Sequence, residues 1–157
     1  MRYFLFGFLA TALAACSPGA SEASPKEAVA VHPVSGLKVI PLTITSASGV
    51  HRFKVEVAGS QEEQSMGLMF RTTLAPDEGM IFPMKPVREA TFWMHNTVIS
   101  LDLIFISPNG RISNIAARAV PYDKTVLPSV GKVKGVLEIP GGRAAELGIV
   151  PGDKVAW

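Results

Sequence analysis

The chain has 157 residues, 48% of them hydrophobic and 18% charged, with a formal net charge of +2. This length suits one folded domain around one core. The basic residues are scattered along the sequence and form no stripe, which argues against a nucleic-acid-binding surface.

Residues 1–15 have the pattern of a bacterial lipoprotein signal peptide. Arg2 precedes an apolar run that is too short to span a bilayer, and the run ends in small residues directly before Cys16. Such a sequence is cleaved before a cysteine that already carries a diacylglycerol. We therefore expect Cys16 to be the acylated first residue and to anchor the chain stably in a lipid bilayer. Ser17 follows it in place of aspartate, which favours the outer membrane of the cell envelope, with the domain facing the periplasm.

Residues 16–36 predict a disordered tether. They are rich in Ser, Ala and Pro and show no apolar periodicity, so they would bury too little apolar surface to offset the entropy lost on ordering. Cys16 is the only cysteine, which excludes an intramolecular disulfide. The folded domain is then expected over residues 37–157.

The domain has the pattern of short strands. Its apolar and alternating runs are brief and are separated by Gly, Pro and Asn, which favours strands over helices. The expected strands are residues 37–44, 52–57, 79–82, 90–94, 101–106, 111–116, 136–139 and 154–157. The sequence Ser-Pro-Asn-Gly at 107–110 predicts a hairpin turn. Residues 120–133 lack a period and predict a surface loop.

Two short helices are also expected. Ser60 and Glu63 have the spacing of a capping box ahead of residues 64–69. Residues 141–147 predict a second helix that stops at Gly148. Together these elements predict a mainly β single domain with two short helices, folded as a compact, partly closed antiparallel barrel or β-clip-like structure without a parallel sheet.

Several stretches of the domain resemble a known family. They are residues 66–71 (Met-Gly-Leu-Met-Phe-Arg), 79–82 (Gly-Met-Ile-Phe), 92–97 (Phe-Trp-Met-His-Asn-Thr), 101–106, 136–138 and 148–153. From about Phe53 to Val155 the chain is similar to the DUF192 (UPF0127) family, and the Trp-Met-x-Asn-Thr block is the specific part. The resemblance implies a small, mostly β domain, often found behind a signal peptide, and brings no established activity. Family members usually have Lys in place of His95 and Pro in place of Ser100.

A polar cluster after the fourth expected strand is the candidate ligand site. Its residues, with one from the first helix region, are Arg71, Trp93, His95, Asn96, Thr97 and Asp102. An indole wall, a guanidinium fork and a few donors and acceptors are typical of small-molecule sites. The alternative is structural: Asn96 and Thr97 cap a turn, and Arg71 pairs with Asp102. We expect Trp93 to be buried in the core even if it also lines a pocket.

A sulfur-rich set permits a second interpretation. Five of the six methionines lie in the domain, with His95 next to the last of them: Met66, Met69, Met80, Met84 and Met94. Thioethers and an imidazole suit Cu(I), although methionine is also a common filler of small cores. A hydrolase would need a base oriented by a third group, for which His95, Ser100 and Asp102 are the nearest candidates.

The sequence therefore favours a non-catalytic module of the cell envelope that binds a small molecule or a protein partner. A copper-handling protein and a hydrolase are the alternatives. No metal site is assigned, and no cofactor can be named from the sequence.

Overall fold

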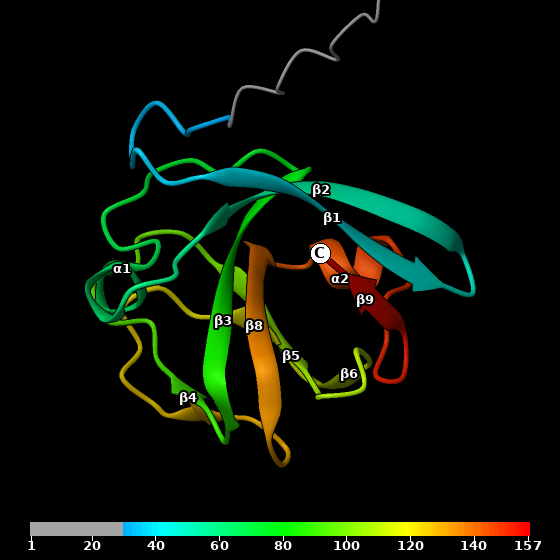
Figure 1. Cartoon of the computed structure of the whole chain (residues 1–157). Coiled ribbons are helices and arrows are strands. Elements are labelled where there is room, and N and C mark those ends of the chain that lie inside the picture. The colour runs from blue at the N-terminus through cyan, green and yellow to red at the C-terminus, as the bar shows by residue number, and fades with distance from the viewer. Residues whose placement is uncertain (1–29) are drawn as a thin grey trace, which may run out of the picture.

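The computed structural model describes residues 30–157, which form one mainly β domain with two short helices, as predicted (Figure 1). The expected signal peptide, Cys16 and the first part of the expected tether lie outside the described residues. The strands are β1 (Val39–Ser46), β2 (Gly49–Val57), β3 (Glu78–Arg88), β4 (Thr91–Phe92), β5 (Leu101–Ile106), β6 (Ile112–Ala119), β7 (Leu127–Pro128), β8 (Val133–Pro140) and β9 (Lys154–Ala156). The helices are α1 (Gln61–Met66) and α2 (Arg143–Glu146).

Seven strands form one curled sheet in the order β6-β5-β8-β3-β2-β1-β9, and β4 pairs with β7 in a separate two-stranded sheet. A bridge between Arg111 and Lys154 joins the chain just before β6 to β9, so the two edges of the curled sheet meet at one end. The expected partly closed barrel is confirmed. It contains one parallel pair, β2 with β3, which was not predicted. Parallel strands need a crossover connection, and the segment containing α1 supplies it.

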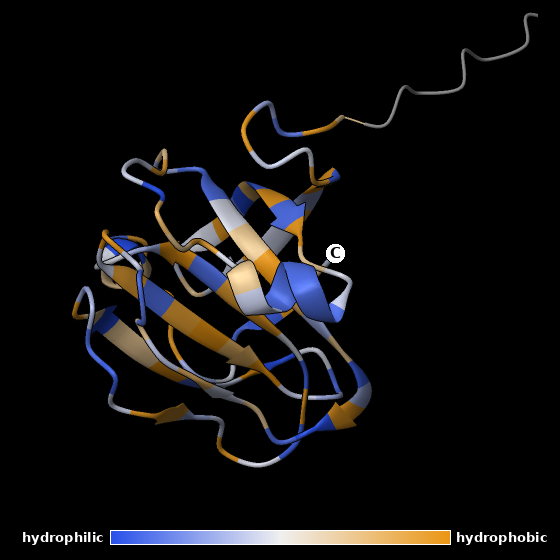
Figure 2. Cartoon of the chain, turned by 90° about the vertical axis from the view of Figure 1, so that its left-hand side faces the viewer, coloured by the Kyte–Doolittle hydropathy of each residue, from blue (hydrophilic) through white to orange (hydrophobic). Residues whose placement is uncertain are grey.

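The two faces of the sheet carry separate apolar cores. Strand β5 is buried along its whole length, and its residues alternate between the two faces. Ile104 and Ile106 pack in the core that contains Ala144 of α2, whereas Leu103 and Phe105 pack in the core that borders β4. Figure 2 shows the hydrophobic strand segments in the middle of the molecule and the hydrophilic α1 at its surface. Because both faces are covered, any polar side chain on β5 or on its neighbour β8 lies in the interior.

The predicted capping box and hairpin turn are confirmed. The Ser60 hydroxyl accepts a hydrogen bond from the Glu63 N–H at 3.1 Å, and the Glu63 carboxylate accepts one from the Ser60 N–H at 2.8 Å. Helix α1 begins directly after this cap and ends at Gly67, whose φ of 48° is left-handed, so residues 67–69 lie outside the helix. No helix among residues 30–157 combines the length and the apolar character needed to cross a membrane.

Several strand boundaries differ from the prediction. Strand β4 is shorter than residues 90–94 and is followed by a turn at residues 95–96, and β7 lies inside the expected loop 120–133. Residues 30–36, expected to belong to the tether, are folded onto the sheet. Val31 pairs with Lys38, and the Ser35 hydroxyl donates to Glu56. A buried carboxylate, not an apolar pattern, holds this segment, so hydrophobic periodicity does not reveal it.

Asp102 ties the second helix to the sheet. Its side chain is fully buried on β5. One carboxylate oxygen accepts hydrogen bonds from the backbone N–H groups of Arg118 at 2.7 Å and Gly142 at 2.8 Å, and the other accepts from Ala144 at 2.8 Å. These charge-assisted bonds compensate for a buried charge that would otherwise be costly. One carboxylate therefore connects β5, β6 and the start of α2.

We expect Asp102→Ala to lower the free energy of unfolding by about 3 kcal/mol or more, because three backbone donors lose their acceptor. Urea denaturation measures the change. The control is Asp77→Ala, which removes a half-exposed carboxylate paired with Lys54 at 3.6 Å and should cost less than about 1 kcal/mol. Equal losses in the two variants would show that Asp102 does not anchor α2.

Candidate functional site

A cleft of about 290 Å³ opens beside the core that borders β4. Residues of α1 and β3 form one side, the segment around β4 forms the other, and β8 contributes Glu138. The lining combines apolar residues, among them Leu68, Phe82, Met84 and Phe92, with polar residues such as Gln64 and Ser65. The rings of Phe82 and Phe92 meet edge to face, with centroids 5.1 Å apart, which gives the cleft a firm aromatic wall.

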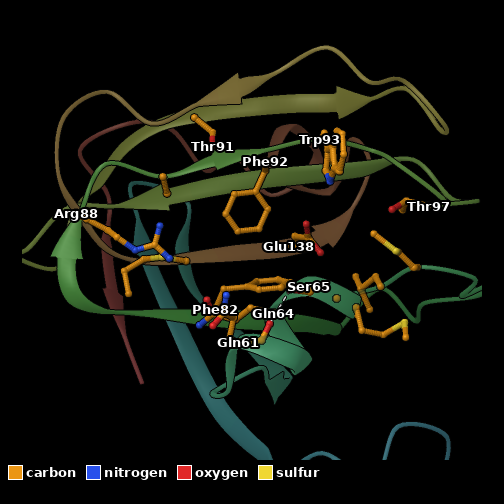
Figure 3. Close-up of a pocket in the computed structure, with 16 residues that line it drawn as sticks. Gln61, Gln64, Ser65, Phe82, Arg88, Thr91, Phe92, Trp93, Thr97 and Glu138 are labelled. Atoms are coloured by element: carbon orange, nitrogen blue, oxygen red, sulfur yellow. Dashed lines mark hydrogen bonds between the residues drawn. The ribbon is translucent and has the colours of Figure 1, made fainter.

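Glu138 is the distinctive polar residue of the cleft. Its side chain is only 5% exposed, and the strand register places it between Met80 of β3 and Leu103 of β5. Within residues 30–157 every side-chain oxygen that is fully enclosed has a hydrogen-bond partner. The Glu138 carboxyl has no such partner, and burial alone shifts its pKa. Its carboxyl oxygens therefore open on the cleft. Figure 3 shows the carboxyl in the middle of the lining, between Phe92 and the α1 residues.

Burial raises the pKa of Glu138 to about 8. Near neutral pH the carboxyl is therefore mostly protonated, and a protonated carboxyl can donate a hydrogen bond as well as accept one. A buried acid with a shifted pKa at the wall of a cleft is a recognised mark of a functional site.

Two glycines permit close packing near Glu138. A Cβ at Gly79 would lie 2.4 Å from the Glu138 carbonyl oxygen, so only glycine lets β3 approach β8 this closely. A Cβ at Gly67 would lie 3.3 Å from the Phe82 ring, and the left-handed φ of Gly67 turns the chain into the cleft after α1. Gly67 lines the cleft, whereas Gly79 lies outside the lining and sets the close spacing of β3 and β8.

Basic side chains lie at one end of the cleft. Arg88 lines it, and Arg88 and Lys85 together line an adjoining hollow that shares Gln61 and Gln64 with the cleft. The Gln64 amide donates to the carbonyl oxygen of Pro83 at 2.9 Å and so holds α1 against β3. None of the four ion pairs found within residues 30–157 includes Lys85 or Arg88.

Exposed aromatic residues lie near the opposite end. Trp93 is 51% exposed, so its expected burial in the core is wrong. The chain reverses at Asn96, whose carbonyl oxygen accepts from the Phe70 N–H at 2.9 Å, and the Thr97 carbonyl accepts from the Tyr122 N–H at 3.1 Å. Phe70, Asn96 and Tyr122 all have positive φ angles. Such angles are rare for Phe and Tyr and often mark functional loops. The three exposed aromatic residues at this end are Phe70, Trp93 and Tyr122.

The structure separates the six residues of the predicted site. Trp93 and Thr97 line the cleft, whereas His95 lies outside the lining and packs against Trp93, with ring centroids 5.0 Å apart and planes tilted by 36°. Asn96 forms the turn through its backbone, and Asp102 anchors α2. Arg71 forms an ion pair through Nη2 with the buried Glu56, so the alternative in which it pairs with Asp102 is wrong.

The methionines divide between the cleft and the core. Met66, Met69 and Met84 line the cleft, whereas Met80 and Met94 are each 1% exposed. The imidazole of His95 does not share the lining with these thioethers. Residues 30–157 contain no group of three or more His, Cys, Asp or Glu side chains placed to hold a metal ion.

Glu138 and Arg88 are the site residues that sequence reasoning missed. A usable signal was present for Glu138. It interrupts the apolar run Val136-Leu137-Glu138-Ile139, and in a buried strand such a position places a carboxyl in the interior.

The comparisons with known proteins agree with this fold. The DUF192 family, described as "Uncharacterized ACR", matches residues 42–157. The solved structure of a protein of unknown function from Novosphingobium aromaticivorans has 56% sequence identity and a TM-score of 0.81, and the match covers 91% of this chain and 100% of that one. A protein from Sinorhizobium meliloti, provisionally described as a transcription regulator, has 36% identity and a TM-score of 0.74, covering 76% and 94% of the two chains. No curated protein matches the chain.

The buried carboxyl predicts a pH dependence of stability. Between pH 4.5, the ordinary pKa of a glutamate side chain, and about pH 8, Glu138 keeps its proton in the folded state and loses it in the unfolded state. Stability should therefore fall as pH rises through this window, by up to about 1.4 kcal/mol per pH unit. Glu138→Gln stays neutral and should remove that part of the slope in urea denaturation at pH 5, 6, 7 and 8. Parallel stability curves for the two proteins would contradict the assignment.

Proposed function

The chain belongs to the DUF192 family, and from that premise we propose that it is a non-catalytic binding module that holds a small molecule in the cleft around Glu138. The observation that carries the proposal is the 5% exposed Glu138 carboxyl, which faces the cleft without a protein partner. Because its oxygens reach the cleft, the hydrogen bonds that a buried polar group normally forms are available to a ligand. A ligand can complete the hydrogen bonding of Glu138, and apolar residues combined with placed polar groups are typical of small-molecule sites.

Binding is favoured over catalysis because the hydroxyl groups of the cleft are not activated. The Ser65 hydroxyl donates to the Gln61 carbonyl at 2.8 Å, and the Thr97 hydroxyl donates to the His95 carbonyl at 3.4 Å. Within residues 30–157 none of the three hydroxyls of the lining, Ser65, Thr91 and Thr97, forms a hydrogen bond to a general base, which a hydroxyl nucleophile requires. A copper-handling role gains no support from the cleft, because His95 lies outside its lining.

We further propose that the module works in the cell envelope, held at the outer membrane by acylated Cys16. The support is the sequence of residues 1–16, with its apolar run and the small residues before the only cysteine. The domain would then meet its ligand outside the cytoplasm, either as a free small molecule or on a partner protein of the envelope.

Cys16→Ser should abolish lipid attachment, because serine lacks the thiol that is acylated. Metabolic labelling with a palmitate analogue is expected to mark the wild-type chain and not the variant, and the variant should appear in the soluble envelope fraction. Labelling that survives the substitution would rule out the lipoprotein assignment.

Ligand binding in the cleft can be tested with N-phenyl-1-naphthylamine, a neutral dye that fluoresces in apolar sites. We expect saturable binding by the purified full chain and a loss of affinity of about tenfold or more, roughly 1.4 kcal/mol, in Ser65→Trp. Ser65 is exposed on α1 and lines the cleft, so the larger ring would fill it. Glu62→Trp is the matched control, because Glu62 is exposed on the same helix outside the lining. Equal binding by Ser65→Trp would contradict the proposal.

A further inference from the structure

We infer that the ligand of the cleft is an anionic amphiphile, a molecule with one apolar body and one terminal carboxylate or phosphate group. The inference rests on the proposed binding function and adds the chemical class of the ligand. It follows from three parts of the cleft that lie one after another along its length. Arg88 is at one end, Glu138 is in the middle and Trp93 is at the other end (Figure 3).

The basic end supplies the attraction for an anion. Lys85 and Arg88 are both exposed, both line the adjoining hollow, and neither forms an ion pair within residues 30–157. The nearest acid in sequence, Glu89, is exposed and does not line either hollow. The planar guanidinium of Arg88 offers two parallel N–H donors, a geometry that matches carboxylate and phosphate oxygens. Two neighbouring cations without a local counter-ion favour an anionic group at this end.

The middle of the cleft fits an apolar body of limited size. Its apolar part consists of the edge-to-face rings of Phe82 and Phe92, together with Leu68 and Met84, and polar residues of α1 line the cleft beside it. The volume of about 290 Å³ lies just below the range for small-molecule sites, roughly 300–1,000 Å³. One short apolar chain or ring system fits this space, whereas a lipid with two long chains does not.

Glu138 does not repel an anion, because burial keeps its carboxyl protonated near neutral pH. Arg88 and Glu138 are the two ionisable residues of the lining, so no second carboxylate opposes an anionic ligand. The protonated Glu138 can donate a hydrogen bond to an oxygen of the ligand, and its raised pKa keeps negative charge out of the cleft near neutral pH. A cationic amphiphile would instead meet Lys85 and Arg88 with no ionised acid to compensate.

The test uses displacement of N-phenyl-1-naphthylamine from the purified full chain at pH 7. Decanoate and decyl phosphate provide the two anionic head groups, decanol is the neutral probe, and decyltrimethylammonium is the cationic probe. We expect both anions to displace the dye at concentrations about tenfold lower than the other two probes, a preference of roughly 1.4 kcal/mol. If only one anion does so, that head group is the ligand class and the inference holds for it.

Charge variants then test whether Lys85 and Arg88 cause the preference for anions. Lys85→Gln with Arg88→Gln should remove the preference for anions, measured as the ratio of the concentrations of decanol and of each anion that displace half of the dye. The matched control is Lys124→Gln with Lys154→Gln, which makes the same change in net charge at two exposed residues outside the cleft. The control should keep the wild-type preference, because the effect is local.

The outcomes separate this inference from the proposed function. Dye binding with equal displacement by all probes overturns the anionic class and leaves the binding function standing. A preference for anions that survives in Lys85→Gln with Arg88→Gln also overturns the inference, because the charge would then act elsewhere. Absence of dye binding in a folded wild-type chain overturns the binding function itself, and the inference with it.

Discussion

The fold depends on covering both faces of the two adjacent strands β5 and β8. Strand β5 is buried along its whole length and β8 along nearly all of it, so every polar side chain on them must find a partner or stay neutral. Helix α2 covers one face and the segment around β4 covers the other. The cover on the second face is incomplete, and the cleft lies at the gap.

Two carboxyl groups on these strands meet this constraint in opposite ways. Asp102 receives three backbone hydrogen bonds and serves as an internal anchor. Glu138 sits one register position away on the neighbouring strand and faces the opposite core, where burial without donors favours its protonated form. The environment, not the residue type, therefore assigns one acid to the scaffold and the other to the site.

Local signals in the sequence predicted local structure well. The capping box of Ser60, the turn ending at Gly110 and the helix stop at Gly148 each depend on residues a few positions apart, and each is present. Arg71 and Trp93 were misplaced because their surroundings depend on distant segments. The partner of Arg71 is on β2, and the exposure of Trp93 follows from a turn held by hydrogen bonds to residues 70 and 122. Apolar periodicity carries no information about such contacts.

The attachment of residues 30–36 has a mechanical consequence. The chain enters the domain through this segment, which is held at Glu56 by Ser35 and at Arg71 by His32, with the two nitrogens 3.3 Å apart. A pull applied to the N-terminus would load these polar contacts and the pairing of Val31 with Lys38 before it reached either apolar core. Tension on the chain would thus act on the contacts of this segment before it could deform the cleft.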